Sequence, residues 1–220
     1  MINFVKTKSS IECQNKLYDT LINNIKSNKK ILLIVAGGSN VPIIKAVFDK
    51  LPDDLTSNID LILSDERYGS SDFKDSNFVK LQKAGFNIKK AHFENILTNQ
   101  SIDESTRILE NQFARGDKKA EVIIALLGIG QDGHIAGILP NSKALNSESY
   151  ATSYRALDFD RITLSFKALK KINIAIIGAY GIKKRMALIN LKKLELPIEE
   201  MPSKILQEIK SNYIYNDQIG

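Results

Sequence analysis

Cysteine and histidine are scarce in this chain of 220 residues, and tryptophan is absent. The single cysteine, Cys13, allows neither an internal disulfide nor a cluster of cysteine ligands around a metal ion. No apolar run approaches the length of about 18 residues that a membrane span needs, and residues 1–8 lack the apolar core of a signal peptide. We therefore expect a cytoplasmic protein without a membrane partner.

The chain also lacks a large excess of charge of either sign. It has 31 Lys and Arg residues and 25 Asp and Glu residues, which gives a formal charge of +6. The basic residues are spread as pairs such as Lys29-Lys30 and Lys118-Lys119, without a dense block that contains interleaved aromatic residues. This distribution is typical of a solvated surface, and we expect no nucleic-acid partner. The small positive balance would also suit an anionic small substrate.

Short apolar runs alternate along the chain with segments of helical spacing. The length and a hydrophobic content of 43% suit one large globular domain, which we expect to cover residues 1–220. The periodicity predicts strands at 30–36, 59–64, 121–127, 161–166, 172–177 and 212–215, and helices at 10–27, 41–51, 101–115, 183–197 and 202–208, with a further helix from 75–77. Such alternation predicts an α/β fold of three layers (α/β/α), in which helices cover both faces of a mostly parallel sheet.

The most apolar run, at 121–127, ends in a turn that contains three glycines within residues 128–133. Glycine lets the backbone turn sharply and approach a ligand closely. Asp132 and His134 follow the carboxyl end of this predicted strand, which is where open α/β sheets bind ligands. A histidine there is a candidate general base. An isolated Asp-Gly-His more often only caps a turn, so the hypothesis depends on the rest of the chain.

Residues 128–133 also match the G-x-G-x-x-G pattern of dinucleotide sites. That pattern should open a long helix, yet Pro140 follows six residues after His134 and would break one. The acidic residue expected about 20 positions further on would fall near Glu148, which no predicted strand precedes. The pattern therefore argues against a nicotinamide cofactor.

Three other turns carry groups that could hold an anion. Residues 37–40 (GGSN) join a strand to a helix, so free N–H groups and the positive helix end could face a ligand. They lack the G-K-[ST] ending of a nucleotide P-loop, and ATP is not indicated. The triplet 65–67 (DER) follows a strand, and its arginine could hold a phosphate. Lysines 183–184 oppose the dipole of the helix they begin, a cost that a bound anion would offset. In isolation, an ordinary strand-to-helix turn explains the first feature equally well, the charged triplet usually means a solvated loop, and the lysines could be a solvated basic cluster.

Five motifs occur in a fixed order: Ala36-Gly-Gly-Ser39, Asp65-Glu-Arg67 with Asp75-Ser-Asn77, Gly128–His134 with Pro140, Arg161-Ile-Thr-Leu164, and Gly181-Ile-Lys-Lys184. This ordered set resembles the 6-phosphogluconolactonase family, in the superfamily that also contains glucosamine-6-phosphate deaminase and ribose-5-phosphate isomerase. The resemblance extends from about residue 30 to the carboxyl end.

The resemblance implies hydrolysis of 6-phospho-D-glucono-1,5-lactone to 6-phospho-D-gluconate, the second step of the oxidative pentose phosphate pathway, without metal or cofactor. It implies that His134 is the base that activates water and that Asp132 places His134 or the sugar hydroxyls. The implied phosphate ligands are Gly38, Ser39, Arg67 and Lys184, with Arg161 nearby. Because the alignment near Gly181 can slip by one residue, Lys183 could take the place of Lys184.

The chain departs from the family pattern at two places. Asn40-Val41 replaces Thr-Pro after the Gly-Gly-Ser motif, and residues 137–139 replace Ser-Leu-Phe. We therefore expect a first turn and a pocket wall that differ from those of the family.

Two alternative functions stay open. A glucosamine-6-phosphate deaminase would fit residues 128–136, but Leu139 stands where its glutamate belongs and Arg67 stands where it has a tyrosine. A non-catalytic module that senses sugar phosphates is the other alternative, and the presence of Asp132 and His134 speaks against it. Loss of the lactone faster than in a blank without protein would distinguish an enzyme from such a module.

Overall fold

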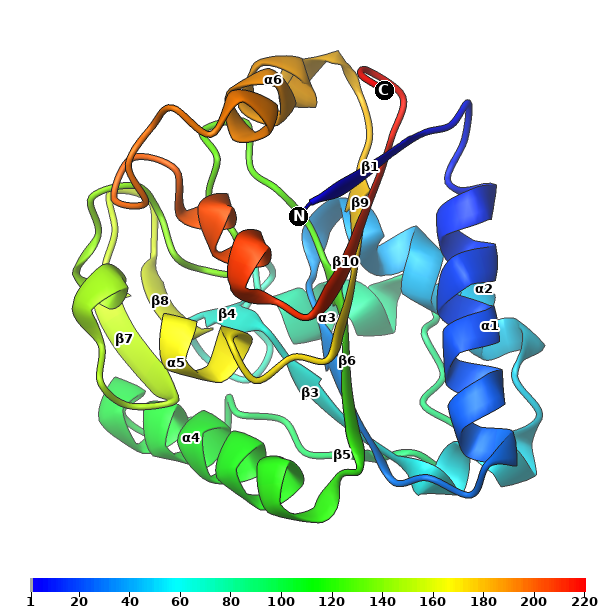
Figure 1. Cartoon of the computed structure of the whole chain (residues 1–220). Coiled ribbons are helices and arrows are strands. Elements are labelled where there is room, and N and C mark those ends of the chain that lie inside the picture. The colour runs from blue at the N-terminus through cyan, green and yellow to red at the C-terminus, as the bar shows by residue number, and fades with distance from the viewer. Residues whose placement is uncertain (1) are drawn as a thin grey trace.

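A parallel sheet of seven strands forms the middle layer of the molecule (Figure 1). In the computed structural model, which describes residues 2–220, the strand order is β1-β10-β9-β6-β2-β3-β5, and every neighbouring pair is parallel. The strands are Asn3–Lys6 (β1), Ile31–Val35 (β2), Ile59–Leu63 (β3), His92–Phe93 (β5), Val122–Leu127 (β6), Ile174–Ala179 (β9) and Ser211–Asn216 (β10).

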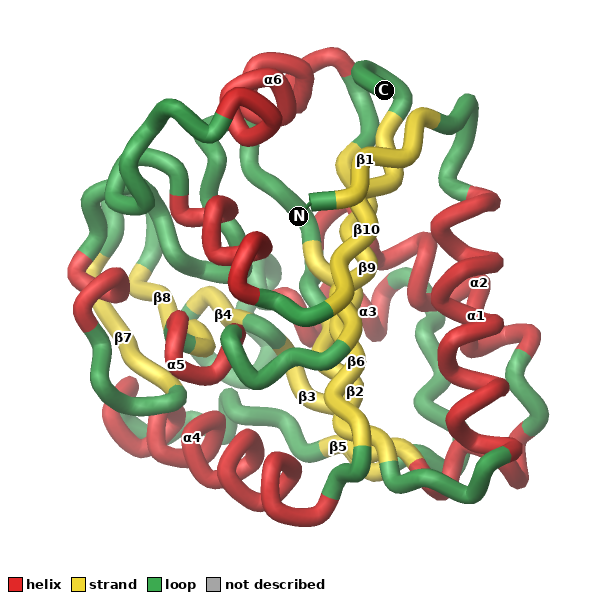
Figure 2. The backbone as a smooth tube through the Cα atoms, viewed as in Figure 1, coloured by secondary structure: helices red, strands yellow, loops and turns green. Residues whose placement is uncertain are grey.

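Helices cover both faces of this sheet, as Figures 1 and 2 show. One face carries α1 (Ile11–Lys26) and α2 (Val41–Lys50), and the other carries α4 (Ile102–Lys119), α5 (Phe166–Leu169) and α6 (Arg185–Lys193). The remaining helices are α3 (Asn77–Lys83) and five 3₁₀ segments: Gly38–Asn40, Asp53–Asn58, Lys143–Asn146, Ile182–Lys184 and Pro202–Glu208. Within residues 2–220, no helix combines the length and apolar character needed to span a bilayer.

Strand β2 shows why the molecule has three layers. All five of its residues are buried, and successive side chains point to opposite faces of the sheet. Ile31, Leu33 and Val35 pack in the core under α1 and α2, whereas Leu32 and Ile34 pack in the core under α4. A strand covered on both faces has no polar side, which is why it reads as an uninterrupted apolar run. The predicted three-layer α/β/α fold with a mostly parallel sheet is confirmed.

A second sheet was not predicted. It is antiparallel, with β8 (Asp160–Leu164) between β4 (Asp65–Arg67) and β7 (Ala151–Arg155). The strand predicted at 161–166 is present as β8, although it ends at Leu164. It is not half-buried as predicted, because residues 161–164 are all buried. Helix α4 packs against this small sheet, while Gly137 N–H donates to Thr163 Oγ1 at 2.9 Å from the loop after β6. Burial on both faces removes the alternation.

Some helix boundaries also differ from those predicted. Helix α4 continues to Lys119, and α6 spans Arg185–Lys193 instead of the predicted 183–197. Leu194 ends α6 because it adopts a left-handed conformation with φ of 60°, which a continuing helix cannot contain. Lysines 183 and 184 belong to the 3₁₀ turn before α6.

The direction in which successive strands are added to the sheet reverses between β2 and β6. From β2 the chain adds β3 and β5 on one side, and from β6 it adds β9 and β10 on the other. Val35 of β2 lies opposite Leu126 of β6, so the turns after these two strands emerge side by side. A crevice at the carboxyl ends of strands where the order reverses is the usual ligand site of an open α/β sheet.

Candidate active site

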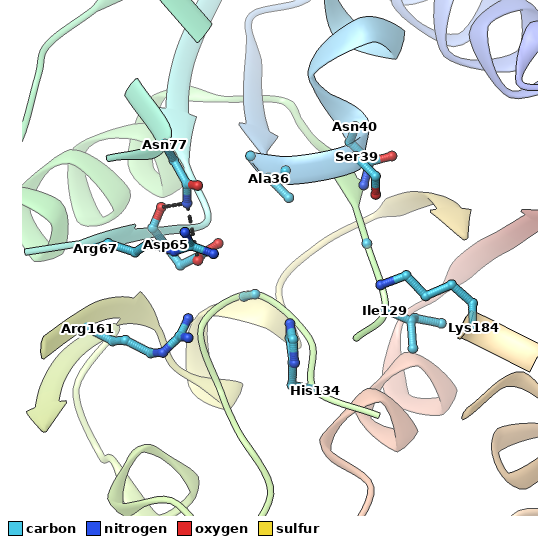
Figure 3. Close-up of a pocket in the computed structure, with 14 residues that line it drawn as sticks. Ala36, Ser39, Asn40, Asp65, Arg67, Asn77, Ile129, His134, Arg161 and Lys184 are labelled. Atoms are coloured by element: carbon cyan, nitrogen blue, oxygen red, sulfur yellow. Dashed lines mark hydrogen bonds between the residues drawn. The ribbon is translucent and has the colours of Figure 1, made fainter. Parts of the chain in front are cut away.

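A cavity of about 250 Å³ lies at this reversal point. Its walls come from the turn after β2, from β4 and the start of α3, from the loop after β6, from β8, and from Lys184. Figure 3 shows the ends of Arg67, Arg161, His134 and Lys184 directed toward this one space. The structure therefore brings together every residue predicted for the site except Asp132, which lies just behind His134.

The Gly-Gly-Ser segment forms the upper wall of the cavity in Figure 3, where Ser39 is labelled. Gly38 has a φ of 63°, a conformation that glycine adopts without steric cost. The 3₁₀ turn Gly38–Asn40 then leads directly into α2, with Pro42 in the first turn of the helix. The N-terminus of a helix of ten residues, preceded by glycines, attracts an anion through its free N–H groups and dipole.

His134 and Asp132 form a pair in the loop after β6. The distance between His134 Nδ1 and Asp132 Oδ1 is 2.6 Å, and His134 N–H donates to the same oxygen at 3.2 Å. A side chain at Gly130 could not coexist with this pair, because its Cβ would lie 2.1 Å from Nδ1. Partial burial opposes ionisation of Asp132, but the hydrogen bond and charge of His134 prevail and lower its pKa to about 2. Asp132 is therefore an anion at neutral pH.

An ionised carboxylate can only accept hydrogen bonds, so Asp132 fixes the imidazole tautomer. Nδ1 must carry the proton, and in the neutral ring Nε2 is then left with a free lone pair. In Figure 3 the ring of His134 points into the cavity, away from its own loop. The free nitrogen is thus available as a proton acceptor.

The two arginines at the cavity differ in how they are held. The Arg161 side chain is 8% exposed, and its Nη2 donates to Asp158 Oδ2 at 2.7 Å. Arg67 has no hydrogen-bond or ion-pair partner for its guanidinium among residues 2–220, and its guanidinium carbon lies 4.9 Å from the centroid of the Phe159 ring. The N–H groups of the Arg67 guanidinium are therefore free for a ligand.

Lys184 supplies a further positive charge without a carboxylate within salt-bridge distance among the described residues. Desolvation by burial lowers the pKa of Lys184, although the charge of Asp132 partly opposes this effect. Lys183 is exposed and does not contact the cavity. The geometry therefore favours Lys184 over Lys183 as the lysine that faces the ligand.

Three polar residues at the cavity were not assigned as site residues from the sequence. Asp65 and Asn77 line one wall, and Asn77 Nδ2 donates to the Asp65 carbonyl at 3.0 Å and to Asp65 Oδ2 at 3.3 Å. Asn40 lines another wall, with its amide beside the backbone of Gly128 and Gly178. Asp65 could have been found, because it belongs to the same charged triplet as Arg67. Asn40 was recognised only as a departure from the family pattern.

Glu66 holds the Asp65–Arg67 strand against the start of α3, although it does not line the cavity. It is fully buried, and its Oε1 accepts from the N–H groups of Arg67 (2.7 Å) and Asn77 (2.6 Å). Its Oε2 accepts from Ser76 Oγ (2.9 Å) and Phe78 N–H (3.0 Å). Burial raises the pKa of Glu66, and these four donors partly offset that effect. The helix dipole also stabilises the negative charge of a carboxylate at a helix N-terminus.

Ala136 lines the cavity, and residues 137–139 follow it in the same loop without lining the cavity themselves. Tyr154 Oη donates to the Gly137 carbonyl at 2.6 Å and accepts from Leu139 N–H at 3.3 Å. These bonds fix the loop where the sequence departs from the family pattern. Across residues 2–220, no group of three or more His, Cys, Asp or Glu side chains is arranged to hold a metal ion.

Comparison with known proteins gives a consistent picture. The family model described as glucosamine-6-phosphate isomerases/6-phosphogluconolactonase matches residues 6–215. A probable 6-phosphogluconolactonase from Dictyostelium discoideum is 26% identical over an alignment that covers 99% of this chain and 98% of the relative. The 6-phosphogluconolactonase of Borreliella burgdorferi is also 26% identical, over 89% of this chain and 87% of its own length.

The fold recurs in solved structures. A crystal structure of a 6-phosphogluconolactonase from Shewanella baltica superposes with a TM-score of 0.84 at 19% identity, and covers 98% of this chain and 97% of the other. The 6-phosphogluconolactonase from Thermotoga maritima gives a TM-score of 0.80 at 21% identity, with 98% of each chain covered. At these identities the likeness shows that the fold is shared.

Proposed function

This chain belongs to the glucosamine-6-phosphate isomerase/6-phosphogluconolactonase family, and we propose that it hydrolyses 6-phospho-D-glucono-1,5-lactone to 6-phospho-D-gluconate. The reaction is the second step of the oxidative pentose phosphate pathway. Relatives named as 6-phosphogluconolactonases match nearly the whole chain, which supports this substrate over others in the family. The enzyme is a hydrolase of carbohydrate metabolism that acts on a lactone ester.

One observation carries the proposal: two of the positive groups at the cavity, those of Arg67 and Lys184, lack anionic partners among the described residues. The guanidinium of Arg67 and the ammonium of Lys184 face the same space, and neither forms an ion pair within the described part of the chain. Ser39 and the N-terminus of α2 add neutral donors on the opposite wall. Such a set of free donors is what a phosphate requires, because its oxygens accept hydrogen bonds and carry negative charge.

The free Nε2 of His134 borders the same cavity and supplies the base. A water molecule attacks the lactone carbonyl carbon, and its proton passes to Nε2 as the tetrahedral oxyanion forms. Collapse of this intermediate breaks the bond between the carbonyl carbon and the ring oxygen. The ring oxygen then takes the proton from the imidazolium and becomes the free hydroxyl of 6-phosphogluconate. Asp132 stabilises the transient imidazolium through Nδ1.

The phosphate site contributes to catalysis by positioning the substrate beside His134. A phosphate held by Arg67 and Lys184 fixes one end of the substrate, so the other end meets His134 in a defined orientation. Restricting a reactant in this way removes part of the entropic barrier to reaction. A lactone is a reactive ester, and a base together with a held phosphate is sufficient chemistry for its hydrolysis. We therefore propose an enzyme without metal or cofactor.

The domain organisation is part of the same proposal. We propose one domain over residues 1–220, since β1 near the amino end pairs with β10 near the carboxyl end and so ties both ends of the chain into one sheet. The cytoplasmic location and the absence of a nucleic-acid partner stay predictions.

A time-resolved assay tests the function. Fresh 6-phosphogluconolactone hydrolyses spontaneously, so its loss must be followed with protein and in a matched blank without protein. We expect faster loss with protein, and no release of ammonia from glucosamine-6-phosphate, because Leu139 stands where the deaminases have a glutamate. A rate equal to the blank would overturn the proposal, and ammonia release would transfer the chain to the deaminase branch of the family.

A further inference from the structure

The tip of the β7–β8 hairpin, residues 156–159, contacts both arginines of the site. The Phe159 ring lies against the guanidinium of Arg67, and the carboxylate of Asp158 holds Arg161. We propose that Phe159 is a positioning residue, which orients Arg67 for the phosphate without consuming any of its hydrogen-bond donors. The proposal rests on the proposed function, since it assigns Arg67 to the phosphate of the substrate.

The argument begins with the shape of a guanidinium. Its five N–H groups point outward in the plane, and its faces carry no donor. An aromatic ring attracts the cation through its π electrons and can hold it from one face. The guanidinium carbon of Arg67 lies 4.9 Å from the centroid of the Phe159 ring, within the range of about 6 Å for such an interaction. The edges of Arg67 therefore stay open to phosphate oxygens.

Arg161 shows the contrasting arrangement in the same cavity. One of its edges is occupied, because Nη2 donates to Asp158 Oδ2 at 2.7 Å, and its buried Nε has no partner within the described residues. A carboxylate that held Arg67 in the same way would compete with the phosphate for the same N–H groups. An aromatic face restricts the arginine and avoids this competition. The hairpin tip thus holds one arginine by its edge and leaves the other free to bind.

Phe159 is itself held in place. Its ring meets the ring of Phe73 edge to face, with centroids 5.8 Å apart and an interplanar angle of 70°. The turn is closed by a hydrogen bond from Ala156 N–H to the Phe159 carbonyl at 3.0 Å. Tyr68, the residue after Arg67, donates its N–H to the Asp160 carbonyl at 2.8 Å, which ties β4 to the same hairpin. The ring and the arginine are therefore fixed relative to each other by two strands.

Replacement of Phe159 by leucine tests the role, because leucine keeps an apolar side chain but lacks a π face. We expect Phe159→Leu to raise KM for the phosphorylated lactone, and Kd for 6-phosphogluconate and inorganic phosphate in calorimetry, by about 3- to 10-fold. We expect kcat to stay within about twofold of its original value. Phe159→Tyr retains the ring face and should bind phosphate as the original protein does.

Two further variants separate positioning from a general effect on structure. Leu157→Ala changes the fully exposed neighbour in the same turn and should leave phosphate binding unaltered. In the double variant Arg67→Ala/Phe159→Leu, the phenylalanine change should add nothing to the loss caused by Arg67→Ala, since non-additivity is expected of residues that act together. Additive losses would show that Phe159 acts elsewhere and would overturn the proposal.

Each outcome has a distinct meaning. If the original protein hydrolyses the lactone and Phe159→Leu binds phosphate equally well, the positioning role is wrong and the proposed function stands. If the original protein does not accelerate hydrolysis, the proposed function fails, and the calorimetric comparison with inorganic phosphate still decides the role of Phe159. Phe159 is only partly buried, but should the leucine variant unfold, Phe159→Met also removes the ring and carries the same expectation.

Discussion

His134 Nδ1 lies 2.6 Å from Asp132 Oδ1, and this contact assigns the two nitrogens of the ring different tasks. Nδ1 is committed to the carboxylate, so only Nε2 can exchange protons with a substrate in the cavity. The orientation comes from the turn itself, because Gly130 leaves room for the pair and the Asp132 carboxylate also accepts the His134 N–H. A short loop after the central strand thus contains both the proposed base and the carboxylate that orients it.

Replacement of the base should remove most of the chemical step. We expect His134→Ala to lower kcat by roughly 10²–10⁴, with little change in KM, because a positioned base acts mainly in the transition state. Activity should also fall in acid, as the ring becomes protonated and can no longer accept a proton. His92 is the control: it is exposed and lies outside the cavity, so His92→Ala should be silent. A variant His134→Asn with near-normal kcat and an unchanged acid limb would reject the role.

Removal of the orienting charge should have a smaller effect. Asp132→Asn keeps an acceptor for Nδ1 but loses the charge that stabilises the imidazolium, so we expect kcat to fall by less than in His134→Ala.

The Asp132→Asn change also affects stability in acid. The pKa of Asp132 is lowered from 3.8 to about 2, so its ionised form stabilises the folded state above about pH 4, and this contribution is lost as the pH falls through about 2. Unfolding midpoints between pH 5 and 2 should therefore fall less in Asp132→Asn than in the original protein.

The positions of the main motifs could be predicted because parallel strands buried on both faces leave a clear trace. Strands β2 and β6 read as apolar runs, and each ends in glycines followed by polar groups, so the edge of the sheet that binds ligands can be inferred. The resemblance of the ordered motifs then implied His134, Arg67 and Lys184 as site residues. All three reach one cavity.

The second sheet could not be predicted from local sequence. Asp65 lies opposite Thr163, nearly a hundred residues further along the chain, and nothing near either residue indicates this pairing. Three consecutive charges also suggest a solvated loop, yet Glu66 is fully buried because four donors surround its carboxylate. The contact between Arg67 and Phe159 depends on the same pairing of distant strands. Long-range register, more than local propensity, decides these features.

The phosphate site should depend on Arg67 more than on either lysine. An arginine can pair with two phosphate oxygens at once, whereas a lysine acts as a point charge. We expect Arg67→Ala to raise KM by about 10- to 10²-fold, as loss of a charged hydrogen bond of about 1.5–3 kcal/mol would, and Arg67→Lys to restore only part of this. Lys184→Ala should raise KM less. Lys183→Ala is the matched control, since Lys183 does not reach the cavity. Unchanged kinetics in Arg67→Ala would mean that the phosphate binds elsewhere.

Chelation should not affect the enzyme. The proposed mechanism uses a histidine base and a phosphate clamp, and neither His92 nor His134 has a histidine or cysteine at ligand spacing in the sequence. We expect full activity after exhaustive dialysis against a chelator, measured in the same lactone assay. A loss of activity that Zn²⁺ or Mg²⁺ restores would overturn the mechanism, whereas a loss that neither ion restores would indicate damage during dialysis and require a fresh preparation.

Glu66 should be essential to the wall that carries Arg67, although it never touches the substrate. Each of its carboxylate oxygens accepts two hydrogen bonds, so Glu66→Gln places an NH₂ group against two donors and leaves them without an acceptor. We expect the free energy of unfolding to fall by about 1–3 kcal/mol, measured by urea denaturation. KM should rise as well, because the backbone N–H groups of Arg67 and Asn77 are both held by this carboxylate.

Glu94→Gln is the control for Glu66→Gln. Glu94 forms an exposed ion pair with Arg115, so its replacement should cost no more than about 1 kcal/mol and leave KM unchanged. Equal stability losses in the two variants would show that burial of Glu66 does not organise the site.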